Sequence, residues 1–157
     1  MIQISNLKTF PHWADTIADR AWHAWWTESD VSLAQYRAHI DPMIDGNGVP
    51  FALVAHSDGI YLGSVFVIEN DLDERPQYAP WIAALWVEEE ARRQGIAATL
   101  IAVARREISA LGHDTCYLCA SAENSPYYLA RGFKQIESDV SGLNLFSIDS
   151  SSEAERR

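Results

Sequence analysis

Residues 86–101 read WVEEEARRQGIAATLI, and they place a basic, glycine-containing corner between two apolar runs. The run before the corner, WIAALWV at residues 81–87, is apolar throughout, which is typical of a strand buried on both faces. After the corner, apolar residues recur at steps of four and three, as on one face of an amphipathic helix: Ala97, Ile101, Ala104, Ile108 and Leu111. Gly112 follows where a glycine commonly ends a helix. The corner therefore connects a strand to the N-terminus of a helix.

The corner itself, RRQGIA at residues 92–97, has the properties of an anion site. The first backbone N–H groups of a helix lack partners, and the positive end of the helix dipole lies beside them. Arg92 and Arg93 add charge where acids are more usual, and Gly95 allows close approach to the backbone. A plain helix start with two exposed arginines is the alternative. Phosphate or pyrophosphate fits the corner. It is not a P-loop, since no Gly-Lys-Ser/Thr follows, nor a dinucleotide fingerprint, since it has one glycine.

The rest of the chain divides into helix and strand segments on either side of this unit. Before it we predict, in order, a strand at residues 2–10, a helix after Pro11 within 12–26, a helix at 32–44 that Pro42 breaks or ends, a hairpin of strands at 51–56 and 60–68, and an acidic connection at 69–80. After it we predict a strand at 114–120, a short helix at 124–131, and strands at 133–138 and 143–148.

This order predicts an α+β domain with α/β/α layers. The strands at 81–87 and 114–120 are joined by a helix, so they are expected to be parallel with a right-handed crossover. The short helix is predicted to have Ser125 as its N-cap, Pro126 at its first position and Gly132 at its end. The chain has 157 residues, which suits one domain, here placed at residues 1–149, with a polar tail at 150–157.

The composition restricts the partner and the compartment. The formal net charge is −10, from 12 Lys and Arg against 22 Asp and Glu, which disfavours nucleic acid and favours neutral or cationic small partners. No signal-peptide pattern or bilayer-spanning apolar run is present, so we expect a cytoplasmic protein with no membrane partner. Cys116 and Cys119 lie in one predicted strand and are expected to serve packing. The histidines show no metal-ligand spacing, so we expect no metal site.

Two blocks of the sequence resemble the GNAT superfamily of acetyl-CoA-dependent N-acetyltransferases. Residues 86–101 are similar to its pyrophosphate loop, Arg/Gln-x-x-Gly-x-Gly/Ala, through Arg92, Gly95 and Ala97. Residues 122–137 (AENSPYYLARGFKQIE) are similar to a later motif, in which a Tyr, here Tyr128, stands four residues before Gly-Phe. The order of predicted elements is also similar. The resemblance implies a GNAT-like mixed, mostly antiparallel sheet with a central parallel strand pair flanked by helices.

The resemblance also implies acetyl-CoA as co-substrate and a position for it. Its pyrophosphate would lie on the backbone amides of residues 93–98, and its pantetheine arm would pair with the backbone of residues 85–87. The implied cofactor contacts are Leu85, Trp86, Val87, Arg92, Arg93, Gln94, Gly95, Ile96, Ala97, Ala98 and Asn124. Asn124 stands closer to Tyr128 than in the Asn-bearing form of the family motif.

By the same resemblance, Tyr128 is the expected catalytic residue, a general acid toward the departing CoA sulfur. A free Tyr has a pKa of about 10 and a thiol about 8.5, so full proton transfer is uphill by roughly 2 kcal/mol. Tyr128 would therefore act mainly as a hydrogen-bond donor while charge builds on sulfur, or would have a shifted pKa. The alternative is that Tyr128 is a core aromatic residue on a short helix.

The acceptor side is expected between the two early helices and beside the acidic connection. Trp22, Trp25 and Trp26 include candidates for an aromatic platform under a cationic amine, although at least two of them are expected to pack in the core. In the acidic connection, Glu69, Asp71 and Asp73 border this side, with a solvated loop as the alternative for each. The candidate substrate contacts are Trp26, Glu28 and Asp71. No residue is assigned as general base.

Together these features predict an enzyme that moves an acetyl group from acetyl-CoA to a primary amine, by direct attack in a ternary complex. The acceptor is expected to be a small cationic molecule, such as an aminoglycoside or polyamine, with a peptide amine as a further option. The alternative is a non-catalytic acyl-CoA sensor or interaction module with a GNAT fold. Monomer and homodimer both remain open.

Overall fold

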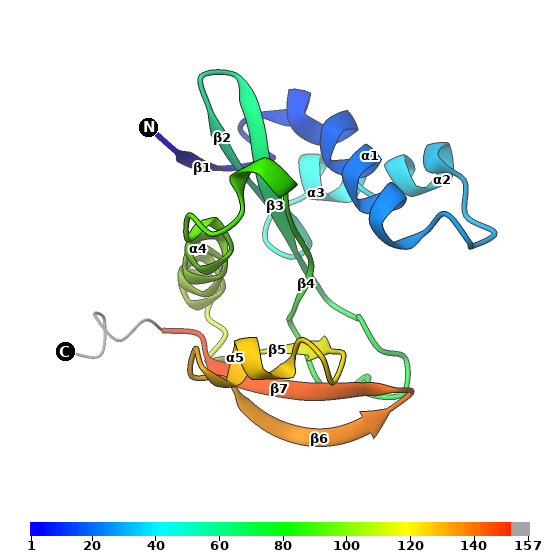
Figure 1. Ribbon diagram of the computed structural model, residues 1–157, viewed down its shortest axis with the longest axis vertical. Helices are drawn as coiled ribbons and strands as arrows, with labels where there is room; N and C mark the ends of the chain where they lie inside the picture. The colour runs from blue at the N-terminus through cyan, green and yellow to red at the C-terminus, as the bar shows by residue number, and fades with distance from the viewer. Residues whose placement is uncertain (152–157) are drawn as a thin grey trace.

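Seven strands form one mixed sheet in the order β1-β2-β3-β4-β5-β7-β6 in the computed structural model, which describes residues 1–151 (Figure 1). Neighbouring strands are antiparallel except for the parallel pair β4 and β5. The strands are β1 (Gln3–Asn6), β2 (Phe51–Ser57), β3 (Ile60–Ile68), β4 (Trp81–Val87), β5 (Thr115–Ala120), β6 (Lys134–Val140) and β7 (Leu143–Asp149). The helices are α1 (Ala14–Trp25), α2 (Leu33–Ala38), α3 (Asp41–Asp45), α4 (Ile96–Ala110) and α5 (Ser125–Leu129), with 3-10 turns η1 (Pro11–Trp13) and η2 (Glu89–Ala91). The predicted α+β fold with a central parallel pair is confirmed.

Helices cover both faces of the first strands, as Figure 1 shows for α4 on one side and α1 to α3 on the other. Neighbouring residues of β2 belong to different cores: Leu53 packs with Leu100 of α4, and Val54 packs with Ile17 of α1. Successive side chains of a strand point to opposite faces, so β2 can be apolar at every position only because both faces are covered.

Helix α4 has a buried stripe that differs from the predicted one at both ends. Its buried residues are Ile96, Leu100, Ile101, Ala104 and Ile108. Ala97 is only partly buried and Leu111 is 45% exposed, because the large side chains of Ile96 and Leu100 remove more apolar area from water than an alanine does. Gly112 ends the helix as predicted, with φ +94°. Its N–H donates to Ser109 O at 2.9 Å, and that of the next residue donates to Ile108 O at 3.3 Å.

The parallel strands β4 and β5 pair over a very short length and then diverge. They share one residue pair, Trp81 with Tyr117. Beyond it, β4 is irregular: its register with β3 shifts, and Ala84 has φ 52°. The prediction that residues 81–87 are buried on both faces is therefore wrong after Ile82, since the remaining residues are only partly buried. A strand without a neighbour at one edge leaves its side chains and backbone groups open there.

The segment before the hairpin is less regular than predicted. The strand predicted at residues 2–10 is confined to β1, and the chain turns at residues 7–9. The single helix predicted at 32–44 is two short helices. Helix α2 begins with a capping box between Ser32 and Gln35 and ends at Ala38. Pro42 does not end it but lies in the first turn of α3, where its missing N–H costs no helical bond.

The start of α5 also differs by one residue. Asn124 occupies the N-cap position without a side-chain cap, so the prediction of Ser125 as N-cap is wrong. The buried Ser125 hydroxyl instead donates to Ser121 O at 2.8 Å and accepts from Asn144 Nδ2 at 3.0 Å. Gly132 closes the turn after α5 with φ +90°, and the next N–H donates to Tyr128 O at 3.1 Å.

The last described residues pack against the domain. The side chain of Ser150 is buried, its N–H donates to Asp114 O at 2.9 Å, and its hydroxyl donates to His113 O. The rest of the predicted tail, residues 152–157, lies outside the described residues. Within residues 1–151, the helices are all too short or too polar to cross a membrane.

Candidate active site

The corner after β4 presents a row of backbone amides. The chain passes through η2, and then Arg93 and Gly95 adopt left-handed φ values of 67° and 78° before α4 begins. Thr99 N donates to Gly95 O at 3.0 Å, as in a regular helix. Among the described residues, the amides of residues 93–98 have no protein acceptor. Such amides at the positive end of a 15-residue helix form a ready anion site.

Gly95 and Arg93 both have a left-handed backbone conformation, which glycine adopts easily and arginine does not. A Cβ built on Gly95 would meet nothing within 4 Å, so the glycine is required by its backbone conformation and not by crowding. Arg93 adopts a similar conformation with a side chain, which is a local strain of the kind found at ligand-binding sites. The side chains of Arg93 and Gln94 are exposed.

The Arg92 side chain is held by contacts within the protein. Its Nε donates to Val87 O at 2.9 Å, and its guanidinium lies over the Trp86 ring with 4.9 Å between Cζ and the ring centroid. Trp86 in turn donates from Nε1 to Glu88 Oε2 at 3.1 Å, and Glu88 pairs with Arg20 of α1 at 2.6 Å. These contacts connect the corner to α1.

A cavity of about 960 Å³ lies where β4 and β5 separate. Residues 82–85 of β4 and 118–120 of β5 line it from the sheet. Asn124 and Tyr128 line it from the side of α5, and residues 68–71 line it after β3. Side chains of α1, α2 and α3 complete it. We call this cavity the cleft.

The predicted cofactor contacts divide between the cleft and the corner. Leu85 and Asn124 line the cleft, whereas residues 92–98 form the corner at the start of α4. Trp86 and Val87 lie on β4 between these two parts, and Trp86 packs toward α1.

Tyr128 packs in the core on one side and is open to the cleft on the other. Its ring packs on Phe133 and Phe146, with centroid distances of 5.7 and 6.1 Å. The residue is half-buried and lines the cleft. Burial raises the pKa of Tyr128, so its hydroxyl is protonated at neutral pH. Among the described residues that hydroxyl has no hydrogen-bond partner, which leaves it free to donate to a ligand.

Asp71 and Cys119 meet inside the cleft. The Cys119 thiol donates to Asp71 Oδ2 at 3.2 Å. Burial, reinforced by the neighbouring carboxylate, raises the pKa of Cys119 to about 12, so this thiol is a hydrogen-bond donor and a poor nucleophile. Asp71 is exposed as a whole residue, but partial burial of its carboxyl group raises the pKa of that group.

The sequence missed the place of Cys119, which was expected only to pack. Strand alternation was the available signal, since residues three apart in a strand face opposite sides. Cys116 is buried in the core beneath α4, and Cys119 faces the cleft.

The aromatic wall of the cleft comes from the ends of α1 and α2. Trp25 and Trp26 are 50% and 37% exposed and line the cleft. The expectation that at least two of the three early tryptophans pack in the core is therefore wrong, because α1 ends at Trp25. Only Trp22 packs with the core among these three, and its Nε1 donates to Val31 O at 2.8 Å.

Three further cleft residues, Tyr36, His39 and Met43, were not predicted. The Tyr36 ring lies 5.5 Å from that of Trp26, and burial with the charge of Asp71 raises the pKa of Tyr36 to about 12.

Only some of the acidic residues predicted on the acceptor side line the cleft. Glu69 and Asp71 line the cleft. Asp73 lies outside its lining and accepts a hydrogen bond from Asn70 Nδ2 at 2.8 Å. Glu28, predicted as a substrate contact, is exposed and does not line the cleft. In the part of the chain that the structure describes, no cluster of three or more His, Cys, Asp or Glu residues could hold a metal ion.

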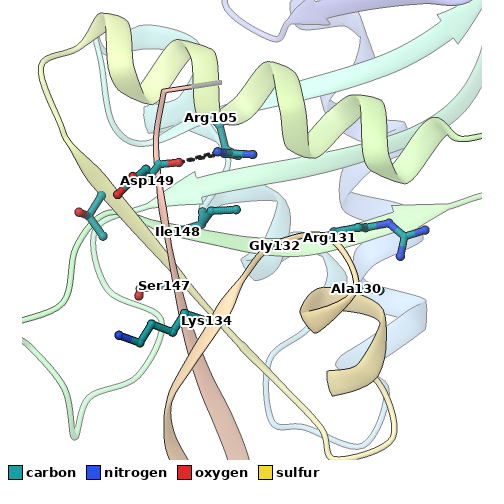
Figure 2. Close-up of a pocket in the computed structure, with 9 residues that line it drawn as sticks. Arg105, Ala130, Arg131, Gly132, Lys134, Ser147, Ile148 and Asp149 are labelled. Carbon is teal, nitrogen blue, oxygen red and sulfur yellow. Dashed lines mark hydrogen bonds between the residues drawn. The ribbon is translucent and has the colours of Figure 1, made fainter. Parts of the chain in front are cut away.

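A second hollow, of about 800 Å³, lies away from these residues (Figure 2). Arg105 of α4, Arg131 and Lys134 contribute positive charge to its lining, and Asp149 contributes negative charge. Figure 2 shows Arg105 reaching the main chain at Asp149, whose carbonyl accepts from Nε and Nη2 at 3.0 and 2.8 Å. Arg105 thus holds the end of β7 in place. Asp71 and Tyr128 line the cleft and do not line this hollow, so the cleft is the better candidate for the active site.

Comparison with known proteins agrees with this geometry. Residues 15–145 match the family described as "Acetyltransferase (GNAT) domain". A comparison with curated protein sequences returns no match.

Solved structures show the same fold. An aminoglycoside 6'-N-acetyltransferase complexed with coenzyme A has a TM-score of 0.73 at 16% identity, over 96% of this chain and 98% of that one. The spermidine/spermine N-acetyltransferase SpeG from Vibrio cholerae, in mutant forms, has a TM-score of 0.65 at 19% identity, over 99% of both chains. YncA from Salmonella typhimurium, solved with its cofactor acetyl-CoA, has a TM-score of 0.72 at 15% identity, over 98% of this chain and 96% of that one.

The chain belongs to the GNAT acetyltransferase domain family, since the match spans most of its length. The prediction of an acetyl-CoA-dependent acetyltransferase is thereby confirmed at the level of the family.

Proposed function

We propose that this chain transfers the acetyl group of acetyl-CoA to the primary amine of a small cationic molecule, by direct attack in a ternary complex, with Tyr128 as general acid. The observation that carries the proposal is one continuous arrangement. Beyond Trp81, β4 borders the cleft that Asp71 and Tyr128 line, and the chain continues from β4 through η2 to the corner with the unpartnered amides of residues 93–98.

On the donor side, the corner and β4 supply complementary groups. Pyrophosphate would accept hydrogen bonds from the amides of residues 93–98, with the exposed Arg93 side chain nearby. The pantetheine arm carries amide groups of its own, and the open edge of β4 after Trp81 offers backbone partners for them. The half-buried Leu85 provides apolar contact in the cleft.

On the acceptor side, the cleft has the chemistry of a cation site. Trp25, Trp26 and Tyr36 provide aromatic faces, and Glu69 and Asp71 provide negative charge. A desolvated cation–π contact contributes up to about 2 kcal/mol. The structural neighbours that act on spermidine or spermine and on aminoglycosides support a cationic acceptor. The formal net charge of −10 favours the approach of cations as well.

At the reacting end, Tyr128 would stabilise the departing sulfur. A raised pKa keeps its hydroxyl protonated but makes complete proton transfer to the thiolate still more unfavourable. Tyr128 is therefore best suited to donate a hydrogen bond to the sulfur as negative charge develops there.

The proposal is tested by CoA thiol release from acetyl-CoA across a panel of amines that includes spermidine, an aminoglycoside and a peptide with a free N-terminus. We expect turnover with at least one polycation. Isothermal titration of acetyl-CoA provides the second measurement. Gly95→Asp adds an anion at the corner and should abolish binding, and unchanged affinity would contradict the donor site. Tight binding without thiol release on any amine would instead indicate an acyl-CoA sensor.

A further inference from the structure

We infer that Asp71 is the general base of the reaction, which takes a proton from the ammonium group of the acceptor, and that Cys119 is the residue that positions its carboxylate. This inference rests on the proposed function, because it assigns a residue to the amine half of that reaction. Sequence patterns alone assign no base to this chain, since strand β4 carries no carboxylate.

The position of Asp71 is the first support. It lies on the connection between β3 and β4 and lines the same cleft as Tyr128. Cys119 lies beside Asp71, since its thiol donates to that carboxylate, and it lines the same cleft. The carboxylate is therefore in the same cavity as the group proposed to meet the thioester sulfur, and the attacking amine must lose a proton in that cavity.

The bonding of Asp71 is the second support. Its Oδ2 accepts a hydrogen bond from the Cys119 thiol at 3.2 Å, whereas Oδ1 accepts no hydrogen bond from any group within residues 1–151. No Lys, Arg or His in that range forms an ion pair with it. A carboxylate with one fixed oxygen and one open oxygen, in a cleft lined by aromatic rings, is suited to receive an ammonium proton.

The other titratable groups that line the cleft with Asp71 are compatible with this chemistry. Tyr36 and His39 come from the side of α2, Glu69 from the same connection, Cys119 from β5 and Tyr128 from α5. Tyr36, Cys119 and Tyr128 all have raised pKa values, so they are neutral at neutral pH. Desolvation raises the pKa of Asp71 toward the operating range, and desolvation of an amine lowers its pKa, so both changes ease the transfer.

The acceptor ammonium gives one proton to Asp71 Oδ1, and the neutral nitrogen forms a bond to the thioester carbon. The carbon–sulfur bond then breaks. The sulfur accepts a hydrogen bond from the Tyr128 hydroxyl as negative charge develops on it, and the surplus proton of the acylated nitrogen then neutralises the thiolate, so that Tyr128 is protonated before and after the step. The products are the acetylated amine, CoA thiol and protonated Asp71, which returns its proton to water.

The experiment compares two isosteric acceptors, butylamine, a cation at neutral pH, and O-propylhydroxylamine, which is neutral and needs no base. Thiol release is measured against pH for the wild-type chain and for Asp71→Asn. We expect kcat/KM for butylamine to fall about 100-fold in the variant. The decline of kcat/KM at low pH, which we call the acidic limb of the pH profile, should disappear. With O-propylhydroxylamine we expect a loss of less than about 10-fold, because that nitrogen already carries its lone pair.

Two variants serve as controls. Asp73→Asn removes a neighbouring charge outside the cleft lining and should behave as wild type. Glu69→Gln removes the other cleft carboxylate and should retain the acidic limb. An equal loss with both acceptors in Asp71→Asn, a retained acidic limb, or loss of that limb in Glu69→Gln would overturn the inference while leaving the proposed function intact. Wild-type turnover of neither probe would instead overturn the proposed function for simple primary amines, and this inference with it.

Discussion

The guanidinium of Arg92 lies 4.9 Å from the centroid of the Trp86 ring, and its Nε donates to the carbonyl that ends β4. The first arginine of the corner therefore fixes the chain between strand and helix, whereas Arg93 has no such contact among the described residues. Two adjacent arginines that look equivalent in sequence thus have different expected roles, one in shaping the corner and one in attracting the anion.

This difference predicts opposite responses to truncation. Arg92→Ala should lower the free energy of unfolding by about 1 kcal/mol, since it removes a hydrogen bond and a cation–π contact. Arg93→Ala should leave stability nearly unchanged and weaken acetyl-CoA binding in a salt-dependent way. Arg93→Gly should be more stable than Arg93→Ala, because glycine adopts a φ of 67° without strain. Urea unfolding and titration at two salt concentrations measure these effects, and equal destabilisation by both alanine variants would contradict them.

Removal of the Tyr128 hydroxyl should affect catalysis and spare the fold. Tyr128→Phe keeps the ring contacts with Phe133 and Phe146, so thermal unfolding should be unchanged. We expect kcat to fall about 100-fold if the hydroxyl supports the leaving sulfur. Tyr127→Phe is the matched control, because its ring packs under Arg131 and does not line the cleft. Full turnover by Tyr128→Phe would reduce this residue to a packing role.

The thiol of Cys119 should set the pH dependence of the amine step. Its hydrogen bond lowers the pKa of Asp71, against the larger effect of burial, which raises it. Cys119→Ala removes that bond, so the carboxyl group should become protonated at a higher pH than in the wild type. The acidic limb of kcat/KM should therefore move to higher pH, and activity near that limb should fall. A limb at the wild-type position would show that Cys119 does not act through Asp71.

Loss of Trp26 should impair substrate binding, whereas loss of Trp22 should impair stability. Trp26→Ala removes an exposed ring of the cleft and should raise KM for a cationic amine about 10-fold with little change in stability. Trp22→Ala removes a ring that packs in the core and a hydrogen bond, and it should cost about 3 kcal/mol of stability. Steady-state kinetics with chemical denaturation distinguishes the two, and a stability loss of similar size in both variants would contradict the assignment.

Glu88 should couple α1 to the corner. It accepts from Trp86 and pairs with a partly exposed Arg20, so Glu88→Ala should cost about 1–2 kcal/mol, whereas Glu88→Gln should cost less because its amide oxygen still accepts from the indole. Equilibrium unfolding of the two variants measures the difference. A larger cost for the glutamine variant would exclude this arrangement.

Local spacing was sufficient to predict the strand, the glycine corner and the helix, because these are adjacent in sequence. Tyr128 became a candidate through the resemblance of residues 128–133 to a family motif, and its catalytic role stays a prediction. What the sequence could not predict depends on residues far apart. Cys119 meets Asp71 across 48 positions, and the separation of β4 from β5 depends on a pairing that no local pattern records. The same holds for Glu88, which had no predicted role until Arg20 and Trp86 were placed beside it.

Strands β4 and β5 are joined by a single residue pair, so the sheet consists of two parts, β1 to β4 and β5 to β7, with little pairing between them. A donor lying along the open edge of β4 would supply the hydrogen bonds that a neighbouring strand supplies elsewhere. Substrate binding would then complete the secondary structure of the enzyme. The amides of β4 after Trp81 should accordingly exchange hydrogen quickly in the free protein and slowly once acetyl-CoA is bound. Acetyl-CoA binding should also raise the melting temperature of the protein.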